Sequence, residues 1–324
     1  MKIAEYLRSK TSKYLLKVAF LALERLRFPA SLWSLIILMP ELRVTAIPEF
    51  KSISVDGVVN WSDWNANKPC DHVVSGWQPD SWGYSKCNIQ IQAFQNFVCA
   101  HTIQNWRCDI QELEGFSNSK SNLFDFDSLN KMVAINSQEM INPITQEKLK
   151  ENLAHKEIRI IHAKSAGDYF HRYAWDGRVF LINSGGSHHL AAARYIASRL
   201  HKKVPLEGKL SNHQLNPEAV NALCDDFYVF IIPSAYVVTS GFKNAMKSFG
   251  ATYYWRPMPR PLHKDYRAIF LPKKEKLSLI VAESLIQAKC LELGEYLISL
   301  CSFQLDNERS FNYLNSIQLP AKND

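Results

Sequence analysis

The architecture of this chain can be inferred most directly from Asp176 to Tyr195, which read DGRVFLINSGGSHHLAAARY. The residues from Arg178 to Asn183 form a short apolar run, which predicts a buried strand. Two glycines, Gly185 and Gly186, follow this run, and the alanine-rich segment from His188 to Lys202 then has the spacing of a helix. We therefore expect a strand, a glycine turn and a helix in direct succession.

A turn of this kind favours an anion at the start of the helix. Glycines let the backbone approach a ligand closely, and the unpaired N–H groups and dipole of the helix start attract a phosphate or carboxylate. Ser187 is placed to cap the helix. The alternative is a turn that only makes a corner in an α/β protein. The residues expected around the anion are Ser184, Gly185, Gly186, Ser187, His188, His189 and Arg194.

The order of strand, Gly-Gly-x-His turn, alanine-rich helix and Val204-Pro205-Leu206 resembles the signature of the ParB/sulfiredoxin superfamily. The resemblance covers Ile158 to Leu210. In that superfamily the equivalent turn cradles the phosphates of ATP or CTP. The resemblance implies that Gly185 and Gly186 form the phosphate-binding turn, and that His188 is the family histidine.

Two positions depart from the pattern of that superfamily. Ser187 stands where sulfiredoxins have their catalytic cysteine, so repair of sulfinic acids through a thiol is excluded. His189 stands where the family usually has arginine, and a neutral imidazole does not replace a bidentate guanidinium. Arg194, further along the helix, is a candidate to compensate for this loss, or else belongs to a solvated helix face.

Carboxylates for catalysis are sought between the strand predicted over Ile158 to Ile161 and the one over Arg178 to Asn183. Asp168 and Asp176 lie in that stretch and could act as a general base or hold Mg²⁺, together with His188 as the third catalytic candidate. The alternative is that they belong to a surface loop. No helical pair of metal-ligating histidines is present, so no structural metal is expected.

A second candidate surface lies in the basic stretch from Lys243 to Lys276, which holds nine basic and two acidic residues. Within it, Thr252 to Lys264 alternates aromatic side chains with cations and prolines. Such a stretch can stack bases while Arg256, Arg260 and Lys264 neutralise phosphates, which makes it a candidate nucleic-acid-binding surface. A proline-ordered loop packed on the core is the alternative.

The N-terminal region reads as a basic amphipathic helix with Leu15, Ala19, Ala22 and Leu26 on one stripe. Charges and Pro29 interrupt its apolar runs, so we expect no transmembrane segment. Packing of the stripe on the protein's own core is expected in preference to a membrane surface. Seven cysteines without a CxxC pair favour reduced thiols in a cytoplasmic protein.

These patterns predict an α/β (α+β) protein with a mixed sheet and packed helices. We expect an accessory region over residues 1–115, made of the basic helix and a tryptophan-rich irregular or β segment, a linker-like segment over 116–130, and a ParB/sulfiredoxin-like domain with a C-terminal helix over 131–324. The strands over Ile158 to Ile161, Arg178 to Asn183 and Phe227 to Ile232 are expected in one sheet.

Three classes of function remain open from the sequence. The resemblance implies a bacterial-type nucleotide-binding protein that takes ATP or CTP with Mg²⁺, and that hydrolyses the nucleoside triphosphate or transfers its phosphoryl group. The basic aromatic stretch alternatively indicates a DNA-binding or DNA-cleaving protein. The third class is a non-enzymatic interaction protein, whose partner would contact the N-terminal region.

Overall fold

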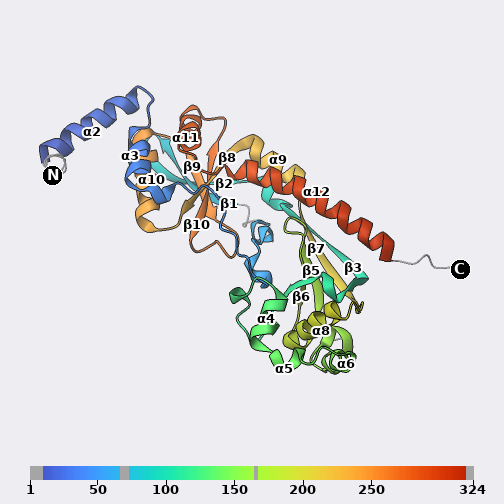
Figure 1. Ribbon diagram of the computed structural model, residues 1–324. Helices are drawn as coiled ribbons and strands as arrows, with labels where there is room; N and C mark the ends of the chain where they lie inside the picture. Colours follow the sequence, from blue (N-terminus) through green and yellow to red (C-terminus); the bar gives the residue numbers. More distant parts are fainter. Residues whose placement is uncertain (1–9, 66–72, 164–166, 319–324) are drawn as a thin grey trace. The chain divides into compact units, whose positions relative to one another are not determined.

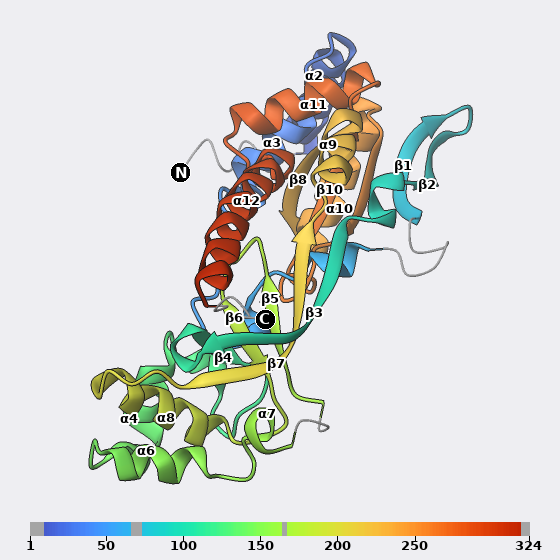
Figure 2. The same ribbon diagram turned by 90° about the vertical axis from the view of Figure 1, so that its right-hand side faces the viewer.

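A computed structural model describes residues 10–65, 73–163 and 167–318 of the chain (Figures 1 and 2). The chain folds into two compact units that interleave along the sequence. Unit 1 comprises the described residues of Met1–Ile47, Asn65–Asn96 and Pro217–Ile298, and unit 2 those of Pro48–Trp64, Phe97–Asn216 and Ser299–Asp324. Helices and strands are both abundant in each unit, so the predicted α+β class is confirmed.

Unit 1 is built on an antiparallel sheet with the strand order β2-β1-β9-β10-β8. Alternate residues of these strands face opposite sides, and each side is covered by helices. Phe230 and Ile269 join the core formed with α3, α10 and α11, whereas Phe270 contacts Phe94 on the other face. The elements are α2 (Lys10–Arg25), α3 (Ala30–Leu38), β1 (Val73–Asp80), β2 (Gly83–Gln90), α9 (Pro217–Asp226), β8 (Phe227–Pro233), α10 (Tyr236–Phe249), β9 (Tyr253–Pro257), β10 (Tyr266–Pro272) and α11 (Lys276–Gln287).

Unit 2 is built on a mixed sheet with the order β3-β7-β5-β6-β4. The pairs β5–β7 and β4–β6 are parallel, and the pairs β3–β7 and β5–β6 are antiparallel. The elements are β3 (Val98–Asp109), β4 (Leu113–Phe116), α4 (Leu129–Asn136), α5 (Gln138–Ile141), α6 (Gln146–Leu153), α7 (Arg159–His162), β5 (Tyr169–Tyr173), β6 (Val179–Ile182), α8 (Ser187–Arg199) and β7 (Pro205–Leu215). Helix α12 (Leu293–Gln318) begins in unit 1 and continues into unit 2.

Helix α8 is the central helix of unit 2. Its Leu190, Ala193 and Ala197 are buried in one core with residues of the sheet. Helices α4, α5 and α6 pack around it, and Figure 2 shows α4, α6 and α8 as one group. The start of α8 is thereby held firmly between the end of β6 and the neighbouring helices.

The prediction of a single sheet is wrong. Strands β6 and β8 both exist, but β6 belongs to the sheet of unit 2 and β8 to the sheet of unit 1. Ile158 to Ile161 is not a strand, because Arg159–His162 forms the short helix α7. The single sheet that we expected for a ParB/sulfiredoxin-like domain is therefore not formed by these three segments.

The domain boundaries also differ from the prediction. Residues 116–130 are no linker, because Leu123, Phe126 and Leu129 are buried in the core of unit 2. These apolar side chains are interspersed with serines and asparagines, and this polar composition is typical of a linker. The predicted division at 115 and 131 cuts through unit 2, since β3 and β4 precede it and pair with β7 and β6.

The amphipathic stripe of the N-terminal helix does not pack as expected. Leu15, Ala19 and Ala22 of α2 are exposed, as is Leu26 directly after the helix, whereas Glu24 is buried and bonds the Ser31 amide and the Ser248 hydroxyl. A buried, hydrogen-bonded carboxylate therefore orients α2 against α3 and α10 more than its apolar stripe does. Among the described helices, none has the length and apolar character needed to cross a bilayer.

Candidate functional site at the start of α8

The glycine turn is formed as predicted, but its two glycines have different roles. Gly186 is the N-cap of α8 and has a left-handed backbone with φ of +72°. A Cβ atom on it would lie 2.7 Å from the carbonyl carbon of Glu157 and from the amide nitrogen of Ile158. Gly185 has ordinary contacts, because its Cβ would lie 3.4 Å from the Cβ of Glu157. Only Gly186 is therefore required by the backbone.

The prediction that Ser187 caps the helix is wrong. Ser187 is the first residue of α8, and its buried hydroxyl donates to Ser119 Oγ at 3.0 Å. Gly186 has no side chain, and no side chain of the described residues caps the helix in its place. The N–H groups of the first turn of this 13-residue helix are left without a side-chain cap, which makes the helix start attractive to an anion.

A pocket of about 680 Å³ opens at this helix start. Of the described residues, two cations line it, Lys120 and Arg159, together with one carboxylate, Glu157. The Arg159 guanidinium donates to Ser184 Oγ at 2.6 Å, so it is held beside the glycine turn. Positive charge therefore exceeds negative charge in the pocket. Hydroxyl groups come from Ser119, Ser121, Ser137, Ser184 and Ser187.

His188 lies in the pocket and is bound at both ring nitrogens. Its Nε2 lies 3.1 Å from Ser121 Oγ, and its Nδ1 lies 2.6 Å from Ser137 Oγ. Burial, followed by the charge of Lys120, lowers the pKa of His188 below its ordinary value, so the ring is neutral at neutral pH. The two serines fix the ring, and they connect the 119–121 segment and the α4–α5 junction to α8. His188 therefore acts as a positioning residue that ties these two segments to the start of α8.

His189 lies on the adjacent wall of the pocket and stacks on His155, with ring centroids 3.6 Å apart. Its Nδ1 lies 3.0 Å from Asn152 Oδ1. The amide nitrogen of Asn152 already donates to the Met140 and Lys148 carbonyls, so Oδ1 is the acceptor and His189 Nδ1 carries the proton. Burial, and next His155, lowers the pKa of His189. The ring therefore supplies no positive charge to the pocket.

The predicted catalytic carboxylates do not line this pocket. Asp168 lies behind the turn, where its Oδ1 accepts hydrogen bonds from the Ser184 amide at 3.2 Å and hydroxyl at 2.7 Å. Asp176 forms a two-bond ion pair with Arg178, at 2.7 and 2.8 Å. Asp168 therefore supports the turn, and Asp176 orients an arginine that also bonds the Ser52 carbonyl.

Arg194 also points elsewhere. Its guanidinium donates to Asn130 Oδ1 at 3.2 Å and to the Gln111 carbonyl at 3.1 Å, and it does not line the pocket. Of the predicted anion-binding residues, the structure brings Ser184 to His189 together and leaves out Arg194. Within residues 10–65, 73–163 and 167–318, no group of three or more potential metal ligands occurs.

The basic stretch of unit 1 is only partly the surface that the sequence predicted. Arg260 and Lys264 are exposed, but Arg256 is half-buried, with its guanidinium carbon 4.3 Å from the ring centroid of Phe94. The expectation that all three are exposed is wrong for Arg256, because its stem and head pack over an aromatic ring.

Sequence reasoning missed the two cations of the pocket. Lys120 lies in the serine- and asparagine-rich segment that was read as a linker, and Arg159 lies between isoleucines that were read as a strand. The signal available was the clustering of hydroxyl and amide side chains from Ser117 to Asn122, which is also the composition of a polar loop around a ligand.

Comparison with known proteins gives one match. The family model described as a family of unknown function, DUF6685, matches residues 103–309. No curated protein and no solved structure matches the chain. The matched residues make up well over half of the chain and include the whole α8 pocket. The chain belongs to the DUF6685 family of unknown function.

Proposed function

We propose that the protein binds a phosphate-bearing small molecule, with a nucleotide as the leading candidate, at the start of α8. The observation that carries this proposal is the uncapped N-terminus of α8, which opens into a pocket of about 680 Å³ beside Lys120 and Arg159. Pockets of roughly 300–1,000 Å³ accommodate small organic ligands. Uncapped N–H groups, a helix dipole and two cations are together suited to a phosphate group.

We propose that the site binds this ligand and does not hydrolyse it. Phosphoryl transfer requires groups that hold Mg²⁺ and orient the nucleophile. The carboxylates of Asp168 and Asp176 are engaged outside the pocket, and Glu157 is the carboxylate among the described residues that line it. Mg²⁺ is usually held by one or two carboxylates plus the phosphates themselves, so ATP or CTP would bring the ion with it, and Glu157 is the protein group suited to it.

The DNA-binding alternative has less support. Of its three predicted residues, Arg256 is half-buried over Phe94, which leaves Arg260 and Lys264 as the exposed cations. Steep weakening of DNA binding with rising salt would favour this alternative, because phosphate-backbone contacts release counterions. The cytoplasmic location remains part of the proposal, supported by six free thiols in the described chain.

Calorimetric titration of ATP, CTP, GTP and inorganic phosphate, with and without Mg²⁺, tests the proposal. We expect at least one nucleotide to bind, and Arg159→Gln and Lys120→Gln each to raise Kd about tenfold or more, because each removes a charge-assisted contact to phosphate. The matched control is Arg199→Gln, an exposed cation at the opposite end of the same helix, which should leave Kd unchanged. The proposal is wrong if none of the probes binds, or if both pocket variants bind as tightly as the wild type.

A further inference from the structure

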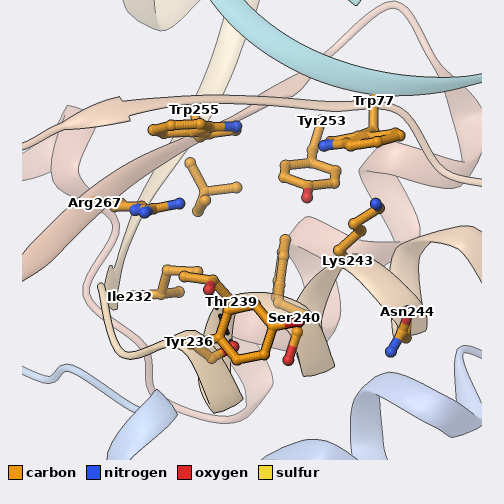
Figure 3. Close-up of a pocket in the computed structure, with 12 residues that line it drawn as sticks. Trp77, Ile232, Tyr236, Thr239, Ser240, Lys243, Asn244, Tyr253, Trp255 and Arg267 are labelled. Atoms are coloured by element: carbon orange, nitrogen blue, oxygen red, sulfur yellow. Dashed lines mark hydrogen bonds between the residues drawn. The ribbon is translucent and has the colours of Figure 1, made fainter. Parts of the chain in front are cut away.

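A second pocket, of about 360 Å³, lies within unit 1 and is independent of the α8 site. Figure 3 shows it between the indole rings of Trp77 and Trp255 on one side and helix α10 on the other. Strand β1 supplies Trp77, and β9 supplies Trp255 and Tyr253. These strands are neighbours in the sheet, with Ser75 paired to Trp255 and Trp77 paired to Tyr253. The aromatic wall is therefore fixed by strand register.

Two cations lie beneath this aromatic wall (Figure 3). Arg267 places its guanidinium carbon 4.3 Å from the Trp255 ring centroid, and Lys243 places its Nζ 3.4 Å from the Trp77 ring centroid. Neither side chain forms an ion pair or a side-chain hydrogen bond with the described residues. No carboxylate of residues 10–65, 73–163 or 167–318 lines the pocket. The indole faces hold both cations in place while their charge remains uncompensated.

Tyr253 adds an unsatisfied donor to the pocket. The residue is 4% exposed, and Figure 3 shows its hydroxyl pointing into the space above α10. This hydroxyl has no hydrogen-bond partner among the described residues, whereas Tyr84 in the same unit donates to the Ala251 carbonyl at 2.8 Å. Burial raises the pKa of Tyr253, so the hydroxyl keeps its proton. The hydroxyl faces the pocket space, where it is placed to donate a hydrogen bond to a ligand oxygen.

The opposite wall, formed by α10, offers a ligand apolar surface and few free hydrogen-bond donors. The hydroxyls of Thr239 and Ser240 already donate to carbonyls within α10, at 3.2 to 3.3 Å. Phe242 and Ile269 are buried and close the apolar side of the pocket. The pocket thus combines apolar walls with two cations and one O–H donor on its aromatic side. Its volume is near the lower end of the range for small-molecule sites, which excludes an extended nucleic-acid strand.

We infer that this pocket binds a small aromatic carboxylic acid. The carboxylate would accept hydrogen bonds from the Arg267 guanidinium and the Tyr253 hydroxyl, because a planar guanidinium matches a planar carboxylate in two parallel bonds. Lys243 adds positive charge at the other indole ring. The flat ring of the acid would pack among Trp255, Phe242 and Ile269, where aromatic rings gain from edge and face contacts.

Calorimetry on the full chain tests this inference with benzoate, indole-3-acetate, cyclohexanecarboxylate and phenyl phosphate as probes. We expect the two aromatic acids to bind, cyclohexanecarboxylate to bind at least about threefold more weakly because it lacks a flat ring, and phenyl phosphate to bind more weakly than benzoate. Arg267→Gln should raise the Kd of the acids about tenfold or more, and Tyr253→Phe about fivefold.

The matched control is Lys274→Gln, which removes a cation of the same unit that is 87% exposed and paired with Asp226. The Lys274→Gln variant should bind the aromatic acids with the Kd of the wild type. Tyr253→Phe keeps the ring and its packing, and circular dichroism confirms that each variant is folded. The inference is overturned if neither aromatic acid binds, if phenyl phosphate alone binds, if cyclohexanecarboxylate binds as well as benzoate, or if folded Arg267→Gln and Tyr253→Phe bind like the wild type.

Discussion

At the scale of single residues, the two glycines before α8 differ in how strictly the backbone requires them. Gly186 must be glycine, whereas position 185 has room for a Cβ atom. The sequence marks Gly185 and Gly186 as equivalent, and their chemistry as glycines is the same. The structure distinguishes them because only Gly186 has a positive φ and a backbone neighbour at 2.7 Å. That distance depends on the 157–158 segment, and the sequence contains no local signal for this contact.

We predict that Gly186→Ala destabilises the protein by about 1–3 kcal/mol, because a Cβ atom would both strain the left-handed backbone and meet the Glu157 carbonyl group. Gly185→Ala should change the free energy of unfolding by less than about 1 kcal/mol, since its Cβ would have ordinary contacts. Urea denaturation of both variants measures the difference. Equal destabilisation by the two substitutions would contradict the roles assigned here.

His171 makes the free energy of unfolding of unit 2 depend on pH. It lies on β5, is 8% exposed, and neither ring nitrogen has a hydrogen-bond partner in the described structure. Its ring centroid lies 4.6 Å from that of His213 and 4.4 Å from that of Tyr173. Burial, followed by the charge of His213, lowers the pKa of His171 to about 4. The folded protein therefore strongly disfavours the protonated ring.

Because the folded pKa is below that of the unfolded chain, roughly 6.5, the unfolded state binds the proton first as the pH falls. The contribution of neutral His171 to the free energy of unfolding is fully present above a pH of about 6.5, and it is lost as the pH falls toward about 4. We predict that His171→Phe reduces the loss of unfolding free energy between about pH 7 and pH 5 by about 1–2 kcal/mol. An exposed control, His101→Phe, should leave the slope unchanged. A slope unaltered by His171→Phe would contradict this assignment.

At the scale of elements, the sequence predicted those whose patterns are long or strongly marked. Strand β6 and helix α8 lie where their patterns placed them. The four-residue segment from Ile158 to Ile161 was too short to distinguish a strand from a turn of helix, and Ile160 instead packs from α7 into the core. The apolar residues from Ala235 begin α10, whose buried Val238, Phe242 and Met246 follow a helical period.

Strand β5 was missed because two of its residues look like surface residues. His171 and Arg172 are polar, but both are buried. Arg172 is buried because its guanidinium bonds the Glu308 carboxylate and the Asn307 carbonyl on α12, and lies 4.2 Å from the Phe311 ring centroid. These partners are more than a hundred residues away in the chain, so no local pattern reveals them. The C-terminal helix is likewise formed as two helices, α11 and α12, and Lys289 between them has a φ of 62°.

We predict that Arg172→Leu destabilises unit 2 by about 3–5 kcal/mol, because it leaves Glu308 without its buried partner. The double variant Arg172→Leu with Glu308→Leu should recover part of this loss, since the uncompensated carboxylate is then removed. Denaturant unfolding measures both, and hydrogen exchange of the 299–311 segment locates the effect. Full additivity of the two single substitutions would contradict a direct coupling between these side chains.

At the scale of the whole molecule, the two units are interleaved, and this could not be inferred from composition. The chain enters and leaves unit 2 more than once: the Phe97–Asn216 passage supplies the strands of its sheet, and the Ser299–Asp324 passage supplies the later part of α12. A division at residue 131 separates β7 from β3, which pair from Val98–Leu215 to Asp109–Pro205. It also removes β4 from the edge of the same sheet.

We therefore predict that a fragment of residues 131–324 does not fold cooperatively, because the edge of β7 and much of the unit 2 core would be exposed. Thermal unfolding followed by circular dichroism tests this, with the full chain as the control. A fragment that unfolds in a single sharp transition near that of the full chain would show that the predicted domain of residues 131–324 is autonomous after all.

The central claim is that a phosphate group binds at the uncapped start of α8, and backbone amide chemical shifts test it most directly. Titration of the isotopically labelled full chain with the nucleotide that binds best should move the amide resonances of Gly186, Ser187 and His188 in proportion to occupancy, because these residues line the pocket at the start of α8. The amides around Arg199, at the other end of the helix, should remain in place. Saturable shifts confined to unit 1, with the amides of the α8 start unmoved, would contradict the claim.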